Sequence, residues 1–421
     1  MNILYTHLST KPVSYVTRDV ERALGFGDDV EGFFIISNKS TFANTRGDKH
    51  ATMVDTGTVL GTRELLESST LPEKSNVLIF KNTRGMERIA HEHGWNLLNP
   101  PARLSDMIEE KISQVGWLGA LNTLLPSHHI SSCGDLLWSG DQYIVQFNHA
   151  HSGEGTLLIS SQKDVDTLRE KFPARPVRVT QFVRGAMYTV NAVVHDSGVL
   201  VSSPSYQITG IAPFTTNVFT TIGNDWGVAD TMLSAEQKEV IRSMAVTIGE
   251  NMRRDGWKGL FGIDVLVEET TGTLYLIEIN ARQPASTTYE SMLQRMEVDR
   301  QPHPNPCLSG RQAPLKKGRE YLITTFEAHL ATLLDLDLSG YSLIPVTSGA
   351  QIIQRITDGI TDVGEEVIAE MENLGCTVRK YTNTKIGSEL LRIQSEKSMM
   401  NKHNLLDDLG QTIAHILQRA T

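Results

Sequence analysis

Short apolar runs alternate with an amphipathic segment in the first hundred residues. Residues 32–36 and 76–80 predict buried strands, residues 85–94 predict a helix closed by glycine, and residues 95–99 predict a further strand. Strands that alternate with helices favour a parallel sheet. No G-x-G-x-x-G turn follows these strands, so the pattern does not predict dinucleotide binding here.

The middle of the chain is richer in strands. Residues 105–125 have a helical apolar period, with Ser105 as the expected N-cap. A second helix over 234–256 is expected to begin in a capping box of Ser234 and Gln237. Its predicted apolar stripe is Val240, Ile241, Met244 and Ile248. The strands predicted between the two helices are 143–147, 155–160, 178–183 and 188–194.

The last third of the chain begins with a proline-rich stretch, residues 300–318, which predicts a loop. Strands are expected at 350–356 and 390–394, followed by a C-terminal amphipathic helix. The apolar positions assigned to that helix are Leu405, Leu406, Leu409, Ile413, Ile416 and Leu417.

Composition narrows the class of protein. A chain of 421 residues predicts two to four domains or subdomains. The net charge of -10 argues against non-specific binding to nucleic acid or anionic membrane. No apolar run approaches the ~20 residues of a membrane helix, and charges come too early for a signal peptide. Three scattered cysteines, Cys133, Cys307 and Cys376, predict neither a zinc site nor a disulfide framework, so a cytoplasmic protein is expected.

Residues 259–287 carry the most chemical information. Asp264 and Glu278 each interrupt an apolar strand-like run, and a turn at 269–272 would join the runs as a hairpin. Alternation along the second strand puts Glu278, Asn280 and Arg282 on one face and Ile277 and Ile279 on the other.

These side chains suit a hard cation and an anionic ligand. Two carboxylates and an amide oxygen form an oxygen-only site for an ion such as Mg2+. An arginine on the same face can hold a phosphate or carboxylate. The alternative interpretation is that these polar residues simply lie on the solvent-exposed face of an antiparallel hairpin. Leu266 on the face of Asp264, and the cost of a buried acid without a partner, weigh against it.

A glycine-containing turn between two strands is a second candidate. Ser152, Gly153, Gly155 and Thr156 lie in it, and the glycines let backbone N–H groups approach an anion. Taken alone, such a turn more often only reverses the chain. His149 and His151 precede it, but no third ligand is spaced near them, so they are interpreted as loop residues.

The acid in the G-x-D strand followed by E-x-N-x-R resembles the metal-binding end of the ATP-grasp ligases. The run GLFGIDVLV…LIEINAR looks most like the peptide ligases of the pheganomycin type. The resemblance implies an α/β (α+β) protein: an N-terminal α/β pre-ATP-grasp domain at 1–104, an ATP-grasp domain at 105–330, and a small C-terminal α+β domain at 331–421.

The resemblance also assigns roles. Asp264, Glu278 and Asn280 would bind the metal, and the glycine loop would cover the triphosphate. Lys111 matches a phosphate-contacting lysine, and Arg282 would neutralise the acyl-phosphate. Gln181, Phe182 and Val183 would line the adenine. Three positions depart from the family: Gln146 stands where a lysine is usual, and Thr180 and Met187 stand where acids are usual. The charge missing at Gln146 would have to come from elsewhere.

The activity implied is ATP-dependent amide formation between a carboxylate and an amine through an acylphosphate, with release of ADP and phosphate. ATP and Mg2+ are the expected cofactors, and Mn2+ could substitute for Mg2+. The expected partners are small-molecule or peptide substrates, with a carrier protein as a further candidate, no nucleic acid and no membrane; a homodimer is the commonest assembly. Two alternatives stay open: a carboxylase-type enzyme that forms carboxyphosphate, and an ATP-binding module without turnover. Gln207 is a further candidate for contact with the acceptor or the γ-phosphate.

Overall fold

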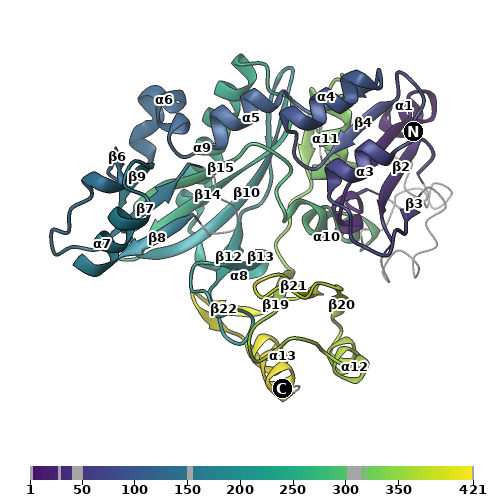
Figure 1. The fold of residues 1–421 in the computed structure, drawn as a ribbon. Coiled ribbons are helices and arrows are strands. Elements are labelled where there is room, and N and C mark those ends of the chain that lie inside the picture. The colour runs from purple at the N-terminus through teal and green to yellow at the C-terminus, as the bar shows by residue number, and fades with distance from the viewer. Residues whose placement is uncertain are drawn as a thin grey trace.

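The computed structural model describes residues 3–26, 30–39, 51–148, 155–300, 315–317 and 320–419 (Figure 1). Three sheets dominate it. In Figure 1 the N-terminal sheet lies at the right, a small four-stranded sheet projects at the left, and a large sheet runs between them toward the C-terminus.

The N-terminal sheet is parallel, as predicted, with strand order β3-β2-β1-β4-β5. Its strands are β1 Val13–Val16, β2 Phe33–Asn38, β3 Ala51–Val54, β4 Asn76–Ile79 and β5 Asn96–Leu97. Its helices are α1 Ile3–Thr10, α3 Thr62–Ser68 and α4 Arg84–Glu92, with a 3-10 turn at Val20–Ala23. The central strand, β1, is buried at all four positions because helices cover both faces.

The small sheet is antiparallel with order β6-β9-β7-β8. Its strands are β6 His128–Ser132, β7 Tyr143–Phe147, β8 Thr156–Ile159 and β9 Pro176–Gln181, and α7 Gln162–Lys171 packs on it. The apolar core between the helix and the sheet includes Val145, Val177 and Leu168. The opposite face of the small sheet is directed toward the large sheet.

The large sheet has the order β15-β14-β10-β12-β13-β19-β21-β20, and β11 pairs with β10 outside this path. Its strands are β10 Gly185–His195, β11 Gly198–Val201, β12 Ser205–Thr209, β13 Thr221–Asp225, β14 Gly259–Glu268, β15 Leu274–Asn280, β19 Ala350–Arg355, β20 Thr377–Lys380 and β21 Glu389–Ser395. The last three come from beyond residue 331, so the C-terminal strands extend the central sheet. The boundaries after 104 and 330 stay predictions.

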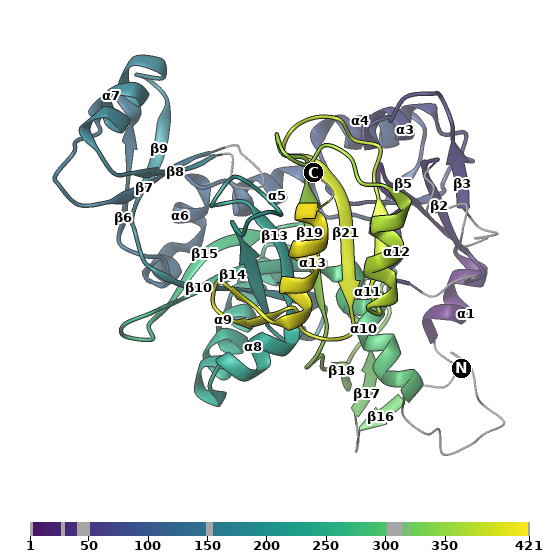
Figure 2. The same ribbon diagram turned by 90° about the horizontal axis from the view of Figure 1, so that it is seen from below.

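Helices cover the large sheet. α9 Ala235–Arg254 packs on β10, β11 and β14. α12 Glu365–Asn373 and α13 Asp408–Arg419 lie beside β19 and β21 (Figure 2). α11 Thr325–Leu333 joins the N-terminal sheet to β10 and β14 through a shared apolar core. The remaining elements are α8 Trp226–Met232, α10 Thr287–Arg300, β16 Leu315–Lys317, β17 Glu320–Ile323, β18 Tyr341–Leu343, β22 Met400–Lys402 and β23 Leu405–Leu406.

The helix predicted over 105–125 is wrong as a single element. The chain forms α5 Ala102–Glu109, α6 Ser113–Leu118 and a 3-10 helix at Gly119–Leu124. Ser105 is not an N-cap, because it lies inside α5, where its hydroxyl donates to the Ala281 carbonyl at 2.6 Å. The break between α5 and α6 contains Lys111, which tertiary contacts hold toward the large sheet.

Three smaller predictions also need correction. The α9 capping box is confirmed, but Val240 is 46% exposed and does not join the buried stripe. Leu405 and Leu406 form β23 rather than a helical turn. Within the predicted proline-rich loop, residues 315–317 form strand β16, whereas residues 301–314 lie outside the described part of the chain.

A glycine fixes the start of β14, the strand that carries Asp264. Gly259 has φ +92°, and a Cβ there would lie 2.5 Å from Nδ1 of His329. His329 is 4% exposed and its Nδ1 accepts a hydrogen bond from the Leu260 N–H at 3.0 Å. Burial lowers the pKa of His329 to about 3, so the ring is the neutral acceptor that this contact needs.

Replacing Gly259 by Ala is therefore expected to destabilise the protein by roughly 2–5 kcal/mol, from backbone strain and overpacking together. Chemical denaturation measures the loss. Gly256→Ala is the matched control, because Gly256 has φ +87° but no atom within 4 Å of its Cβ position. Equal losses in the two variants would show that the contact with His329 adds nothing.

Candidate active site

A cleft with two lobes lies between the small sheet and the large sheet. The apolar lobe, about 470 Å³, is lined by residues such as Phe182, Val183 and Leu266. The polar lobe, about 290 Å³, is lined by Lys111, Asp264, Glu278, Asn280 and Arg282, among others. Residues that line both lobes are Gln146, Thr156, Met187, Gln207, Thr209, Phe219 and Ile277. The lobes are therefore continuous.

The two acids of the polar lobe are cross-strand neighbours. Asp264 on β14 pairs in register with Glu278 on β15, as the predicted hairpin requires. The register then shifts, and Val265 pairs with Leu276. Ile277 is the extra residue of this bulge and lines both lobes, so its predicted place on the face opposite Glu278 is wrong. A bulge rotates the strand locally, which alternation alone does not foresee.

Asp264 is buried in a polar surround. One carboxylate oxygen accepts from the Thr189 hydroxyl on β10 at 2.7 Å, and the other accepts from the Asn280 amide at 3.3 Å. Burial raises the pKa of Asp264, and the negative charge of Glu278 raises it further; Thr189, Lys111 and Asn280 oppose the rise. A bound cation would replace the proton that burial favours.

Glu278 faces cations. Its Oε1 lies 2.8 Å from Nζ of Lys111, and 32% of its side chain stays exposed to the cleft. Burial alone would raise the pKa of Glu278, but Lys111, Arg282 and Arg178 outweigh burial and hold it below its usual value. Lys111 is 7% exposed, and both residues of this ion pair line the polar lobe.

Arg282 is held from two sides. Its Nε donates to Glu109 Oε1 at 2.8 Å, and one terminal nitrogen donates to Asn280 Oδ1 at 2.8 Å. Glu109 also binds Lys81 at 2.5 Å. Two directed contacts on one guanidinium fix its plane, and Arg282 lines the polar lobe.

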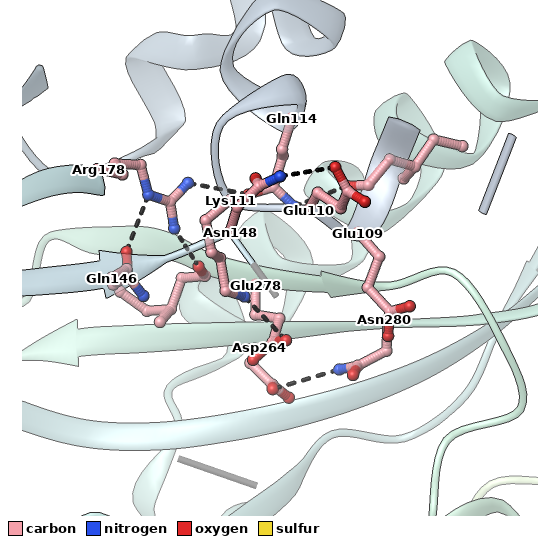
Figure 3. A network of polar contacts seen from close by, with 12 residues as sticks. Glu109, Glu110, Lys111, Gln114, Gln146, Asn148, Arg178, Asp264, Glu278 and Asn280 are labelled. Carbon is pink, nitrogen blue, oxygen red and sulfur yellow. Dashed lines mark hydrogen bonds and ion pairs between the residues drawn. The ribbon is translucent and has the colours of Figure 1, made fainter. Parts of the chain in front are cut away.

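The residues of the polar lobe fit a hard divalent cation. The carboxylates of Asp264 and Glu278 come from paired positions of one hairpin, and Mg2+ prefers such oxygen ligands together with phosphate oxygens. The Asn280 oxygen accepts a hydrogen bond from Arg282. The Asn280 amide nitrogen faces Asp264 (Figure 3), so Asn280 can serve as a metal ligand only if its amide turns. No cluster of three His, Cys, Asp or Glu side chains with metal-ligand geometry occurs among the described residues. The donor set is thus two carboxylates and an amide.

Acid is expected to weaken divalent cation binding at this site. Protonation of Asp264 removes a ligand, and its raised pKa brings this about at a less acidic pH than for an exposed aspartate. Titration with Mn2+ as a spectroscopic probe should show affinity falling up to about tenfold per pH unit on the acidic side. Asp264→Asn should bind weakly with no such slope. Affinity that stays constant down to pH about 4.5 would contradict the assignment.

The apolar lobe contains the predicted adenine residues. It is lined at the end of β9 by Gln181, Phe182 and Val183. Thr180 and Met187, which stand where acids are usual in the ATP-grasp ligases, line it too. The turn between β22 and β23 supplies His403 and Asn404 at its edge. The Asn404 N–H donates to the hydroxyl of Tyr206 at 3.0 Å. The C-terminal segment therefore contributes to this lobe.

The predicted phosphate loop is partly described. Gly155 and Thr156 line the polar lobe, and Thr156 pairs with Gln146 across β7 and β8. Ser152 and Gly153 lie outside the described residues, as do His149 and His151. Gln207 lines both lobes and donates to the Thr189 hydroxyl at 3.2 Å.

Sequence reasoning missed the cation opposite Gln146. Arg178 on β9 pairs in register with Gln146 on β7 and is 2% exposed. Figure 3 shows its guanidinium pointing toward the side chains of Gln146 and Gln114. The sequence did contain a sign of this cation, because Arg178 and Thr180 are two positions apart and so share one face of an otherwise apolar strand. The pairing of β9 with β7 was needed to see it.

Two polar residues of α11 have structural roles. Glu327 caps its own helix by accepting from the Thr324 N–H at 3.0 Å and accepts from the Tyr5 hydroxyl at 2.8 Å. His329 positions β14, as described above. Neither lines a lobe of the cleft.

Comparisons with known proteins agree with this geometry. The profile of the ATP-grasp domain matches residues 108–286. The fold is an ATP-grasp fold of mixed α/β content. No sequence among the curated proteins matches the chain. No helix in the described part of the chain is long and apolar enough to span a membrane.

Several solved structures share the fold. Carboxyaminoimidazole ribonucleotide synthase from Aspergillus clavatus, complexed with ATP, is 13% identical with a TM-score of 0.61 over 98% of this chain and 100% of that one. Phosphoribosylamine–glycine ligase from Thermotoga maritima is 11% identical with a TM-score of 0.61 over 97% and 96%. L-amino acid ligase from Bacillus licheniformis is 14% identical with a TM-score of 0.61 over 97% of both chains.

Proposed function

We propose, from the premise that residues 108–286 form an ATP-grasp domain, that the protein is an ATP-dependent carboxylate–amine ligase that releases ADP and phosphate. One observation carries the proposal. Paired acids and two held cations, Lys111 and Arg282, converge in a polar lobe that is continuous with an apolar lobe of the size and lining that suit a purine.

The order of groups in ATP matches the order of the lobes. The base would occupy the apolar lobe beside Phe182 and Val183, and the triphosphate would extend toward Asp264 and Glu278. Mg2+ held by these acids would neutralise the β- and γ-phosphates. Lys111, which is free to exchange its contact with Glu278 for a phosphate oxygen, would restrain the chain of phosphates.

The reaction has two balanced steps. A carboxylate oxygen of the acid substrate attacks the γ-phosphorus, the bond to the β-bridging oxygen breaks, and ADP leaves with that oxygen. The amine nitrogen then attacks the acyl carbon of the acylphosphate, the C–O bond breaks, and phosphate leaves while the nitrogen loses a proton. Positioning and charge neutralisation account for the catalysis, because neither step needs a covalent intermediate with the protein.

Arg282 is the residue to which we assign action on the acyl group. It lines the polar lobe together with Pro284, Ala285 and Ser286, and none of these four residues lines the apolar lobe. A guanidinium fixed by Glu109 and Asn280 can bind the acylphosphate and the tetrahedral adduct without reorganisation. The carboxylate and amine would therefore enter at this end of the cleft.

The finer proposal is peptide-type amide formation. The run of residues 259–282 resembles peptide ligases of the pheganomycin type, and an amino acid, a small peptide or a carrier-bound acyl group would satisfy the chemistry of the site. A carboxylase-type reaction on bicarbonate uses the same first step and is an outcome of the test below.

ADP and phosphate release with Mg-ATP tests the proposal across a matrix of amino acids, small peptides and amines, with bicarbonate as a separate acid. The proposal expects release that requires both a carboxylate and an amine. Release that requires bicarbonate instead would assign carboxyphosphate chemistry. Tight ATP binding without release under every pair would overturn the ligase and favour a binding module.

A further inference from the structure

Arg178 lies where the two lobes of the cleft meet. It lines the apolar lobe, and its register partner Gln146 and the bulged residue Ile277 line both lobes. In a nucleotide whose base fills the apolar lobe and whose γ-phosphate reaches Asp264 and Glu278, the α- and β-phosphates cross this junction. The position of Arg178 therefore corresponds to the α- and β-phosphates.

The guanidinium is held entirely by neutral acceptors. Nε donates to Gln146 Oε1 at 2.8 Å, and one terminal nitrogen donates to Gln114 Oε1 at 3.0 Å. The other terminal nitrogen donates to the Ile277 carbonyl at 3.3 Å. These contacts use three of the five N–H donors of an arginine, so two remain for a ligand. Arg178 forms no ion pair with any residue in the described ranges.

The positive charge of Arg178 is only partly balanced by negative charge nearby. Burial lowers the pKa of Arg178 to about 10, and the charge of Glu278 opposes that shift only in part. Removing a guanidinium from water is costly unless an anion accompanies it, because neutral oxygens supply hydrogen bonds but no charge. Gln114 is itself anchored, since its amide donates to the Ile108 carbonyl at 2.9 Å. The neighbours thus pre-orient a cation that still lacks its counter-charge.

We propose that Arg178 binds the α- or β-phosphate of the nucleotide and so supplies, from strand β9, the positive charge that Gln146 on the facing strand β7 does not. The inference rests on the proposed nucleotide site but not on the identity of the acid or amine. It also gives Gln146 a role: its oxygen accepts from Nε and sets the plane of the guanidinium, with the Thr180 hydroxyl bonded to the same oxygen at 3.4 Å.

The register of β7 and β9 allows the charge to be moved across the strand pair. Arg178→Gln removes the cation, and the double variant Q146K/R178Q returns a cation to the facing position. Binding of adenosine, AMP, ADP and ATP, measured without acid or amine substrates, reports on the phosphates separately from turnover. Arg242→Gln, on the exposed face of α9, is the matched arginine control.

Arg178→Gln is expected to weaken ADP and ATP binding about 10- to 100-fold, with adenosine binding changed by less than about twofold. Q146K/R178Q should recover ATP affinity to within about fivefold of the unmodified protein. A purely structural arginine predicts equal losses for adenosine and ATP, and this result, or unchanged ATP binding, would overturn the proposal. If Arg178→Gln does not fold, Arg178→Lys must keep the preference for ATP over adenosine; equal affinity for the two would also overturn it.

These outcomes separate the two proposals. A protein that binds ATP through Arg178 but forms no amide would keep this inference and lose the proposed ligase. A protein that forms amide with ADP release, and whose Arg178→Gln variant binds ATP unchanged, would keep the ligase and lose the role of Arg178.

Discussion

Replacing Glu278 by Gln is expected to lower ATP turnover roughly 10³-fold while the fold is retained. The change keeps the size of the side chain and removes the charge that a divalent cation would bind. It also removes the partner of Lys111, whose Nζ lies 2.8 Å from Glu278 Oε1. The measurement is the rate of ADP formation at saturating Mg-ATP with the active substrate pair.

Its control is Glu239→Gln, an exposed acid on α9 with a side chain 64% exposed. That variant should keep the full rate. Nucleotide binding without divalent cation should not weaken in Glu278→Gln, since the acid repels phosphate and its neutralisation releases Lys111. A Glu278→Gln enzyme with an unaltered rate would remove the metal assignment for both acids, because Asp264 alone is a poor cation site.

Replacing Arg282 by Ala is the second large effect expected, a fall in kcat of about 10²- to 10³-fold. The guanidinium lines the polar lobe and not the lobe of the proposed adenine residues, so the KM for ATP should change by less than about threefold. Arg282→Lys should recover only part of the rate. An ammonium keeps the charge but cannot span the contacts to Glu109 and Asn280 together.

Steady-state kinetics, with ATP and the acid substrate varied separately, distinguishes a role of Arg282 in nucleotide binding from a role at the acylphosphate. Arg242→Ala, on the exposed face of α9, is the matched control and should leave both constants unaltered. A variant of Arg282 that raises the KM for ATP while kcat holds would show that the residue binds nucleotide rather than the acylphosphate.

The sequence predicted the metal hairpin because its signals are local. An acid in each of two apolar runs, joined by a short turn, fixes both strands and their pairing, and Asp264 does lie opposite Glu278. The parallel N-terminal sheet and the α9 capping box followed in the same way, from periodicity and from end signals. These features depend on residues that are near in sequence.

The features that escaped prediction depend on distant contacts. The break between α5 and α6 contains Lys111, which pairs with Glu278, 167 positions later in the chain, and helical periodicity contains no sign of this contact. The bulge at Ile277 changes which face a residue occupies. The position of Arg178 opposite Gln146 could be recognised only from the pairing of β9 with β7. In each case tertiary structure decided between local alternatives that the sequence left equal.

Transfer of isotope from the acid substrate tests the central claim most directly. With the active pair identified, the carboxylate is labelled with ¹⁸O and the released phosphate is analysed by mass spectrometry. Attack of a carboxylate oxygen on the γ-phosphorus predicts one ¹⁸O atom in each phosphate, with the other retained in the amide. Unlabelled phosphate, with both labelled oxygens left on the acid, would mean that ATP is hydrolysed without acylphosphate formation and would contradict the account.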